Sequence, residues 1–449
     1  MRLKTSSRLI ATGLLLLAVF KVAMADSYYV ECTQANGCIS ELQALVDDYR
    51  EDGDLTGVQV SVSLPAETIG LQPTLTLASG YASKEKSDFV GAPAPGQPHK
   101  KMDLFGDGSI TKSFTASVVL QLEAEGRLTI DDKLEMYLPQ YDAWRNVTIR
   151  QLLNMTSGIF DFTESQDFWL QSVTMPTREW SPAEIVYISY NNVDGADECS
   201  AGGNLCFEPG TDWMYSNTNY ILVSMIIESV TGHFFPDEIK SRLLGEASTL
   251  GQLSNTYYFD HKQPGSNHFF PDNIFVRTVH PYYSLQNIID PYGVYPEDDL
   301  IDMSMSYAGA AGANISNSED IIKWVRLLFQ SNQVLASVQQ EELTSLICVG
   351  INWVGPVDNQ TPQKSKYYAQ PISELSPECN AGFGLGVGGI LTFNDGLVRS
   401  YDGSTPGYNS FYELFERYNI VISAQGDGVS SIDNIPEKIL PILKKYHVE

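Results

Sequence analysis

The chain has 449 residues, and 43% of them are hydrophobic, which indicates a globular protein with a large core or two interlocked domains. Its formal charge of −27 at pH 7 argues against nucleic acid and anionic membrane surfaces as partners. The sequence contains no internal repeat and no low-complexity segment.

The first 25 residues have the pattern of an export signal. Arg2, Lys4 and Arg8 form a basic start, an apolar run follows over residues 9–20, and residues 23–25 (AMA) form a small-x-small cleavage site. The apolar run is too short for a membrane span, and no cysteine follows closely enough to carry a lipid anchor. We therefore expect an exported protein, periplasmic or extracellular, with no membrane anchor after cleavage.

Six cysteines remain in the rest of the chain: Cys32, Cys38, Cys199, Cys206, Cys348 and Cys379. An even number after an export signal indicates disulfides. Short loops favour Cys32–Cys38 and Cys199–Cys206, which leaves Cys348–Cys379, although other pairings are formally possible. Metal binding is the alternative, but no Cys-x-x-Cys occurs and no histidine lies beside a cysteine. We predict no metal and no cofactor.

Strand patterns occur near both ends of the chain, and helical patterns lie between them. Periodicity predicts a helix over 39–50, strands over 57–64 and 75–81, helices over 147–153, 218–231, 321–329 and 435–446, and strands over 384–393, 397–401, 408–415 and 420–425. Strands from both ends around a helical region imply one sheet built from both termini, with a cleft between the sheet and the helices. The predicted fold class is α/β (α+β).

These patterns also divide the chain. We predict a signal peptide over 1–25, the N-terminal part of an α/β domain over 26–104, a mostly helical domain over 105–330 and the C-terminal part of the α/β domain over 331–449. Residues 249–305 are rich in Tyr, Phe, Pro and Asp with little periodicity. We interpret them as an insertion or lid over the cleft, and a variable surface loop is an equally open alternative.

A Ser-x-x-Lys pattern opens a helix at Ser109. Apolar residues recur at helical spacing after it, so Ser109 and Lys112 share one helix face. A lysine half-buried beside a serine can take the hydroxyl proton, because desolvation lowers the pKa of an amine. The pattern alone is weak, since residues 83–86 (SKEK) also satisfy it. The alternative for Ser109 is a helix N-cap followed by a solvated lysine.

Two further motifs lie downstream. Tyr215 and Asn217 place a phenol and an amide two residues apart, where they could relay a proton and bind a carbonyl. A buried tyrosine in a turn is the simpler interpretation. Residues 401–408 (YDGSTPGY) sit at a strand end, where the glycines let a substrate lie close to the backbone. Here the alternative is an ordinary hairpin turn.

In this order and spacing, the three motifs resemble those of the serine β-lactamase and DD-peptidase superfamily. Its marks are Ser-x-x-Lys, Tyr-x-Asn and Lys/His-x-Gly, and the closest groups are class C β-lactamases, D-alanyl-D-alanine carboxypeptidases and related esterases. Residues 152–158 (LLNMTSG) are similar to the family's Leu-Leu-x-His-Thr-Ser-Gly, with Met155 at the histidine. The resemblance covers roughly residues 40–446 and implies a β-lactamase/transpeptidase-like fold.

The resemblance implies roles for individual residues. Ser109 would be acylated, Lys112 would be its general base, Tyr215 would shuttle the proton to the leaving group, and Asn217 would hold the substrate amide. The backbone N–H groups of Ser109 and Ser404 would form the oxyanion hole, with Gly403 beside them. The implied protein is a hydrolase acting on a small-molecule or peptide substrate such as a cell-wall peptide, a β-lactam or an ester. We also expect a monomer.

One departure concerns substrate choice. Tyr401 stands where the family carries Lys or His, and a neutral phenol offers no fixed charge for a substrate carboxylate. Arg399 lies two residues earlier, on the same face of a regular strand, and we hypothesise that it supplies the missing charge. Otherwise an esterase or amidase acting on substrates without a carboxylate becomes the better interpretation.

Other classes remain as alternatives. A non-catalytic penicillin- or peptidoglycan-binding protein would need Ser109 or Lys112 to be lost, and both are present. A Ser-His-Asp hydrolase is disfavoured because no nucleophile elbow surrounds Ser109. A metal hydrolase is disfavoured because no His-x-x-x-His pair occurs.

Overall fold

The computed structural model describes most of the chain after the expected export signal. The described residues are 29–65, 74–83, 96–191, 199, 205–245, 248, 250–259, 261, 271–283, 298–349, 371–372, 379–392, 394–428 and 432–448. The predicted signal peptide of residues 1–25 lies outside them. None of the helices in these described ranges is long and apolar enough to cross a membrane.

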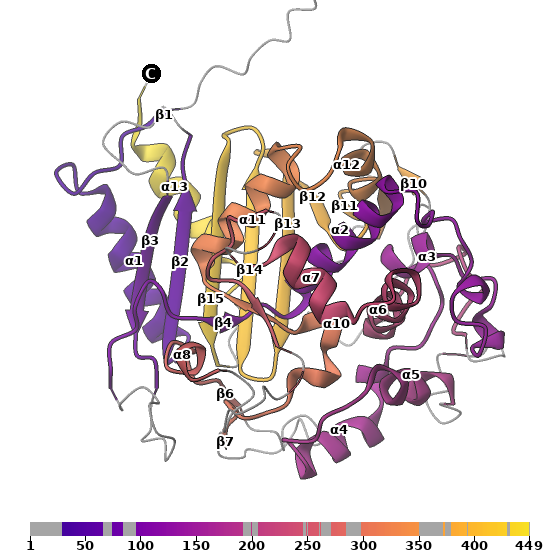
Figure 1. Ribbon diagram of the computed structural model, residues 1–449. Helices are drawn as coiled ribbons and strands as arrows, with labels where there is room; N and C mark the ends of the chain where they lie inside the picture. The colour runs from indigo at the N-terminus through magenta and orange to yellow at the C-terminus, as the bar shows by residue number, and fades with distance from the viewer. Residues whose placement is uncertain are drawn as a thin grey trace, which may run out of the picture.

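A nine-stranded antiparallel sheet forms the centre of the molecule (Figure 1). Its strand order is β10-β9-β11-β12-β13-β14-β15-β2-β3. In chain order the strands are β2 (Gly57–Ser63), β3 (Thr74–Gly80), β9 (Leu346–Cys348), β10 (Pro371–Ile372), β11 (Ala381–Phe383), β12 (Gly388–Thr392), β13 (Gly396–Thr405), β14 (Tyr408–Phe415) and β15 (Ile420–Asp427). Because β2 pairs with β15, the sheet is built from both ends of the chain, which confirms the predicted fold class.

Only part of one predicted strand is a strand. The pattern over residues 384–393 predicts a single strand, but residues 384–387 form the tight turn of a hairpin between β11 and β12, and only Gly388–Thr392 is extended as β12. Gly386 has the positive φ that this turn needs, and a Cβ there would lie 2.8 Å from the Lys112 carbonyl oxygen. The turn therefore packs directly on the helix that carries the nucleophile motif.

Helices cover both faces of the sheet. On one face, α1 (Cys38–Asp52) and α13 (Ile435–Lys445) share an apolar cluster with β2 and β15. On the other face lies α11 (Ser318–Gln330), where Arg326 donates from Nε to Ser63 Oγ at 2.7 Å. The region of residues 105–330 therefore contains one helix that packs on the sheet as well as the helices of the helical region.

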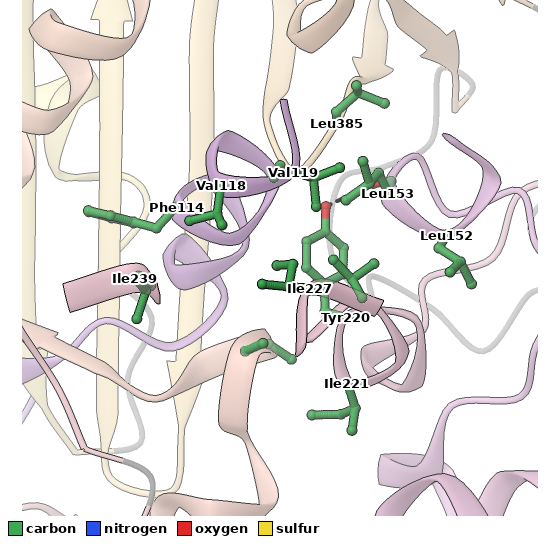
Figure 2. Close-up of a cluster of buried hydrophobic side chains, with 14 of the residues drawn as sticks. Phe114, Val118, Val119, Leu152, Leu153, Tyr220, Ile221, Ile227, Ile239 and Leu385 are labelled. Atoms are coloured by element: carbon green, nitrogen blue, oxygen red, sulfur yellow. Dashed lines mark hydrogen bonds between the residues drawn. The ribbon is translucent and has the colours of Figure 1, made fainter. Parts of the chain in front are cut away.

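The helical region surrounds one buried helix, α2 (Thr111–Ala124). Its other helices are α3 (Ile149–Leu153), α4 (Gln166–Thr174), α5 (Pro182–Tyr190), α6 (Asn217–Thr231), α7 (Phe235–Leu243), α10 (Gly309–Gly312) and α12 (Ser337–Leu343). Figure 2 shows Phe114 and Val118 of α2 within an apolar cluster that also includes Ile227 of α6. The hydroxyl of Tyr220 donates to the Leu153 carbonyl at 2.9 Å (Figure 2). Because α2 is packed from several sides, its N-terminus is held rigidly.

Short strands complete the fold. They are β1 (Tyr29–Val30) with β16 (His447–Val448), β4 (Phe105–Gly106) with β8 (Asn314–Ser316) and β5 (Tyr257–Tyr258), and β6 (Tyr282–Tyr283) with β7 (Asp298–Asp299). A four-residue helix, α8 (Asp272–Phe275), lies in the predicted insertion 249–305. The described part of this insertion packs on the β13–β14 hairpin, where Tyr408 donates from its hydroxyl to the Val279 carbonyl. Whether the insertion is a lid remains a prediction.

All six cysteines form disulfides in the favoured pairing, Cys32–Cys38, Cys199–Cys206 and Cys348–Cys379. Disulfides persist in oxidising environments and are rare in the cytosol. Three of them in one chain indicate an oxidising compartment.

Candidate active site

Ser109 lies in a tight turn, the 3₁₀ segment Gly108–Ile110, between β4 and α2. Gly108 has a φ of 51°, and a Cβ there would lie 2.5 Å from Ser404 N. A Cβ on Gly403 would lie 2.7 Å from Ser109 N. Side chains would therefore prevent this turn from resting on β13. The two glycines bring the backbone N–H groups of Ser109 and Ser404 together, as the resemblance implies for an oxyanion hole.

Lys112 is fully buried one helical turn after Ser109. Its Nζ lies 3.0 Å from Ser109 Oγ, 2.7 Å from Asn217 Oδ1 and 2.8 Å from the Ala311 carbonyl oxygen. Burial lowers the pKa of the Lys112 ammonium to about 7, although nearby carboxylates oppose this shift. A lysine with this pKa is partly neutral at neutral pH and can accept a proton from the serine hydroxyl.

Tyr215 approaches Ser109 from the other side. Its hydroxyl donates to Ser109 Oγ at 2.7 Å and lies 3.3 Å from the Tyr401 hydroxyl. Burial raises the pKa of the Tyr215 phenol above its ordinary value. Tyr215 is therefore protonated at neutral pH, which suits a hydrogen-bond donor or a proton relay better than the initial base.

Asn217 is the first residue of α6, and its amide joins two groups. Oδ1 accepts from Lys112, and Nδ2 donates to Asp161 Oδ2 at 2.9 Å and to Thr163 Oγ1 at 3.3 Å. Asp161 is 4% exposed. The sequence motifs did not single out Asp161; it follows the glycine of the LLNMTSG run by three residues, and no periodicity marks it.

Met155 supports the loop that carries Tyr215. It adopts a left-handed conformation with a φ of 67°, its carbonyl accepts from Met214 N at 3.0 Å, and its Sδ accepts from Ser216 N at 3.4 Å. Sulfur is a weak acceptor. The thioether thus fills the place of the expected histidine and still holds the backbone of the tyrosine loop.

On β13, Tyr401 faces the site and Arg399 does not reach it. The Tyr401 side chain is buried against Phe383 as well as Tyr215. Arg399 instead donates from Nε to Glu416 Oε1 at 2.9 Å. A residue two positions along a strand lies about 7 Å away, and at that distance the Arg399 side chain pairs with Glu416, directly after β14.

A pocket of about 280 Å³ opens over Ser109. The described residues that line it are Ser109, Phe162, Thr163, Trp169, Asn217, Tyr307, Ala308, Ala311, Gly312, Ser404, Thr405 and Pro406. Three of them are large aromatic residues from three separate loops and helices, and none is a lysine or an arginine. The hydroxyl of Thr405 is buried and has no hydrogen-bond partner within the described part of the chain.

A sheet built from both termini, with a serine at the start of a buried helix facing it, defines the β-lactamase/transpeptidase-like fold. The sequence model of the family described as Beta-lactamase matches residues 42–422. The chain therefore belongs to the Beta-lactamase family, as its motifs predicted. Members of this fold family are serine hydrolases that include amidases, peptidases and esterases.

Two curated relatives show different extents of similarity. Penicillin-binding protein 4* of Bacillus subtilis is 35% identical over 147 residues, which cover 33% of this chain and 30% of the relative. Protein flp of Staphylococcus aureus is 28% identical over 355 residues, which cover 78% of this chain and 56% of the relative. The chain thus spans about half or less of the length of these relatives.

Solved structures support the fold. The D-amino acid amidase from Ochrobactrum anthropi SV3, complexed with D-phenylalanine, superposes with a TM-score of 0.65 at 22% identity, covering 92% of this chain and 99% of the amidase. A D-stereospecific amidohydrolase from Streptomyces sp. superposes with a TM-score of 0.63 at 24% identity, covering 86% and 94%.

Proposed function

We propose that the protein is a serine hydrolase that works through an acyl-enzyme on Ser109. The observation that carries this proposal is the placement of Ser109 Oγ within 3.0 Å of Lys112 Nζ and 2.7 Å of the Tyr215 hydroxyl, facing the pocket. A nucleophile in contact with a buried amine and a protonated phenol has both a base and a relay. A non-catalytic binding protein would have no need for this complete set.

The proposed acylation follows from these contacts. Neutral Lys112 accepts the hydroxyl proton as Ser109 Oγ forms a bond to the substrate carbonyl carbon. The N–H groups of Ser109 and Ser404 donate to the resulting oxyanion, a contact worth a few kcal/mol per donor. When the carbon–nitrogen or carbon–oxygen bond breaks, the proton passes through Tyr215 to the leaving group. Water then hydrolyses the acyl-enzyme and restores Ser109.

The pocket favours a neutral acyl donor with an aromatic or other apolar group. Phe162, Trp169 and Tyr307 provide apolar surface, and Tyr401 provides a neutral phenol where the family carries a cation. Arg399 is engaged by Glu416, so our hypothesis that it binds a substrate carboxylate loses its support. The site therefore favours an esterase or amidase over a D-alanyl-D-alanine carboxypeptidase or β-lactamase. The two superposed structures, a D-stereospecific amidohydrolase and a D-amino acid amidase, are in keeping with an amide substrate.

We also propose that the chain is exported through the segment 1–25 to the periplasm or the outside medium. The three disulfides support an oxidising destination. The monomeric state stays a prediction.

A substrate panel tests the proposed function. Purified wild type and Ser109→Ala are incubated with a p-nitrophenyl ester of a neutral aromatic acid, D-phenylalanine amide, a D-Ala-D-Ala peptide and a penicillin, and products and intact mass are followed. We expect hydrolysis of the ester or the amide by wild type alone, with little turnover of the peptide or the penicillin. Turnover of the two carboxylate-bearing compounds at a higher rate would instead establish the carboxypeptidase or β-lactamase activity. Equal turnover by Ser109→Ala would overturn the role of Ser109.

A further inference from the structure

Asp161 is a buried carboxylate that lies behind the catalytic groups: it contacts Asn217, which in turn contacts Lys112. It precedes the 3₁₀ segment Phe162–Glu164, and both of its oxygens accept hydrogen bonds: Oδ1 accepts from Thr163 N at 3.1 Å, and Oδ2 accepts from Asn217 Nδ2 at 2.9 Å. Burial raises the pKa of the Asp161 carboxyl, whereas the hydrogen bonds from Thr163 and Asn217 and the nearby Lys112 ammonium act in the opposite direction and favour the ionised form. Asp161 is therefore placed to act on Asn217 from behind.

The contact with Asp161 decides which way the Asn217 amide points. With Nδ2 directed to Asp161, the opposite atom, Oδ1, faces Lys112 Nζ at 2.7 Å. If the amide were reversed, its NH₂ group would face the lysine amine and its oxygen would face the carboxylate, and both contacts would be unfavourable. Thr163 Oγ1 also accepts from Nδ2, but at 3.3 Å and as a neutral group. A charged acceptor holds the amide more strongly.

Asp161 also balances the charge of Lys112. Two carboxylates act on the lysine, Asp161 from the loop before α4 and Asp402 from β13. The Tyr215 and Tyr220 rings lie 4.9 and 5.6 Å from Nζ, and both phenols are neutral at neutral pH because burial raises their pKa. Asp161 is the larger of the two carboxylate influences, and it is linked to Lys112 through a single amide.

We propose that Asp161 is a positioning residue of this site: it orients the Asn217 amide toward Lys112, and its carboxylate is the counter-charge of the lysine ammonium. This inference rests on the proposed acylation of Ser109. It explains how a fully buried lysine keeps enough basicity to accept a proton. Asp161 touches neither Ser109 nor the substrate pocket, so it acts through Asn217.

The substitution Asp161→Asn tests both parts of the proposal. Its shape is preserved, but it has one acceptor where the carboxylate has two. If the new carbonyl oxygen keeps the Thr163 N–H, the new NH₂ faces Asn217 and forces that amide to reverse. Lys112 then loses an acceptor and a counter-charge together, so its ammonium form is destabilised.

The readout is the pH dependence of kcat/KM for a neutral p-nitrophenyl ester between pH 5 and 9. We expect the acidic limb of the Asp161→Asn profile to move about one unit lower, because Lys112 loses its proton at lower pH. The plateau should fall about tenfold or more, since the remaining base is weaker and Asn217 is misdirected. The matched control, Asp402→Asn, removes the other carboxylate without touching Asn217. It should move the limb in the same direction by less and leave KM unchanged.

The outcomes distinguish a failure of the proposed function from a failure of the proposed role of Asp161. If wild type neither hydrolyses the ester nor is labelled on Ser109 by a fluorophosphonate, the proposed function fails. If wild type is active and Asp161→Asn retains the wild-type limb and plateau, only the role of Asp161 is overturned. The folded fraction of each variant is measured by circular dichroism at every pH and the rates are normalised to it, so that partial unfolding cannot imitate the shift. Asp161→Glu, which keeps the charge, should return the limb toward wild type.

Discussion

The two faces of the central sheet come from the same strands but differ in chemistry. On β2, Val58, Val60 and Val62 face α1 and α13 within an apolar cluster. The alternate residues Gln59 and Ser61 face α11 and make hydrogen bonds: Gln59 Oε1 accepts from Ser318 N at 2.8 Å, and Ser61 Oγ lies 2.8 Å from Ser318 Oγ. Apolar burial is non-directional, whereas hydrogen bonds fix position. On β2, one face therefore contributes apolar burial, and the other contributes directional hydrogen bonds that fix position.

The polar face continues to the nucleophile turn. Asp107, two residues before Ser109, is buried, and its Oδ1 accepts from Ser316 Oγ at 2.5 Å and from Gln425 Nε2 at 3.0 Å. Gln425 belongs to β15, so the sheet itself holds the turn that carries the nucleophile. The comparison predicts that substitutions on the apolar side lower stability with little effect on activity, and that those among the catalytic groups lower activity with little effect on stability, while Asp107 makes stability depend on pH.

Removing the buried amine should produce the largest effect. We expect Lys112→Met to lower kcat/KM about 10²- to 10⁴-fold, because the general base is lost. Its free energy of unfolding should change by less than about 2 kcal/mol, since the lost hydrogen bonds are offset by relief from burying a polar group. Ester hydrolysis and urea unfolding measure the two quantities. The exposed lysine variant Lys438→Met is the control, and a loss below tenfold for Lys112→Met would contradict its role as the base.

A substitution on the apolar face should have the opposite signature. Ile422 on β15 is fully buried in the cluster with α1 and α13. Ile422→Ala should cost about 2–5 kcal/mol of unfolding free energy by creating a cavity, with kcat per labelled Ser109 unchanged. The adjacent residue Ser423 points to the other face, and its buried hydroxyl has no partner in the described part of the chain. Ser423→Ala should therefore leave the free energy of unfolding almost unchanged. Equal losses of unfolding free energy for Ile422→Ala and Ser423→Ala would contradict the difference between the two faces.

Site residues that belong to a sequence motif could be predicted, whereas those that reach the site only through the folding of a loop or helix could not. Helical spacing predicts that Ser109 and Lys112 share one face, and in the structure Ser109 lines the pocket while Lys112 Nζ lies 3.0 Å from Ser109 Oγ. Asp161 and Trp169 follow no periodicity and no fixed spacing from Ser109, so only the folded chain shows that Asp161 contacts Asn217 and that Trp169 lines the pocket. Arg399 shows the limit of strand alternation: alternation predicts the face of a residue but not the partner that its long side chain will choose.

The polar face should also make stability depend on pH through Asp107. Burial raises the pKa of this carboxyl to about 7 in the fold, against about 3.9 in the unfolded chain. The folded state thus favours the protonated form, and this contribution is lost as pH rises from about 4 through 7. Asp107→Asn mimics the protonated form at every pH.

Urea unfolding at pH 5 and pH 8 tests this. Between pH 5 and pH 8, the free energy of unfolding of Asp107→Asn should rise by about 1–3 kcal/mol relative to that of wild type. Glu413, whose pKa burial raises to about 8, shifts both proteins alike and cancels in the difference. A wild-type minus variant difference that stays constant with pH would exclude Asp107 as the titrating group.

The smallest expected effect concerns Met155, whose buried side chain both packs in the core and accepts a hydrogen bond from Ser216 N. Met155→Leu keeps nearly the same volume, so unfolding free energy should change by less than about 1.5 kcal/mol. It removes the sulfur acceptor of Ser216 N and leaves the bond from Met214 N to the Met155 carbonyl. We expect kcat for the ester to fall about two- to fivefold, because one weak hydrogen bond to the Tyr215 loop is lost, and Met155→His to retain more activity than Met155→Leu. If both variants match wild type, the backbone bond alone positions Tyr215, and the thioether at this position serves packing only.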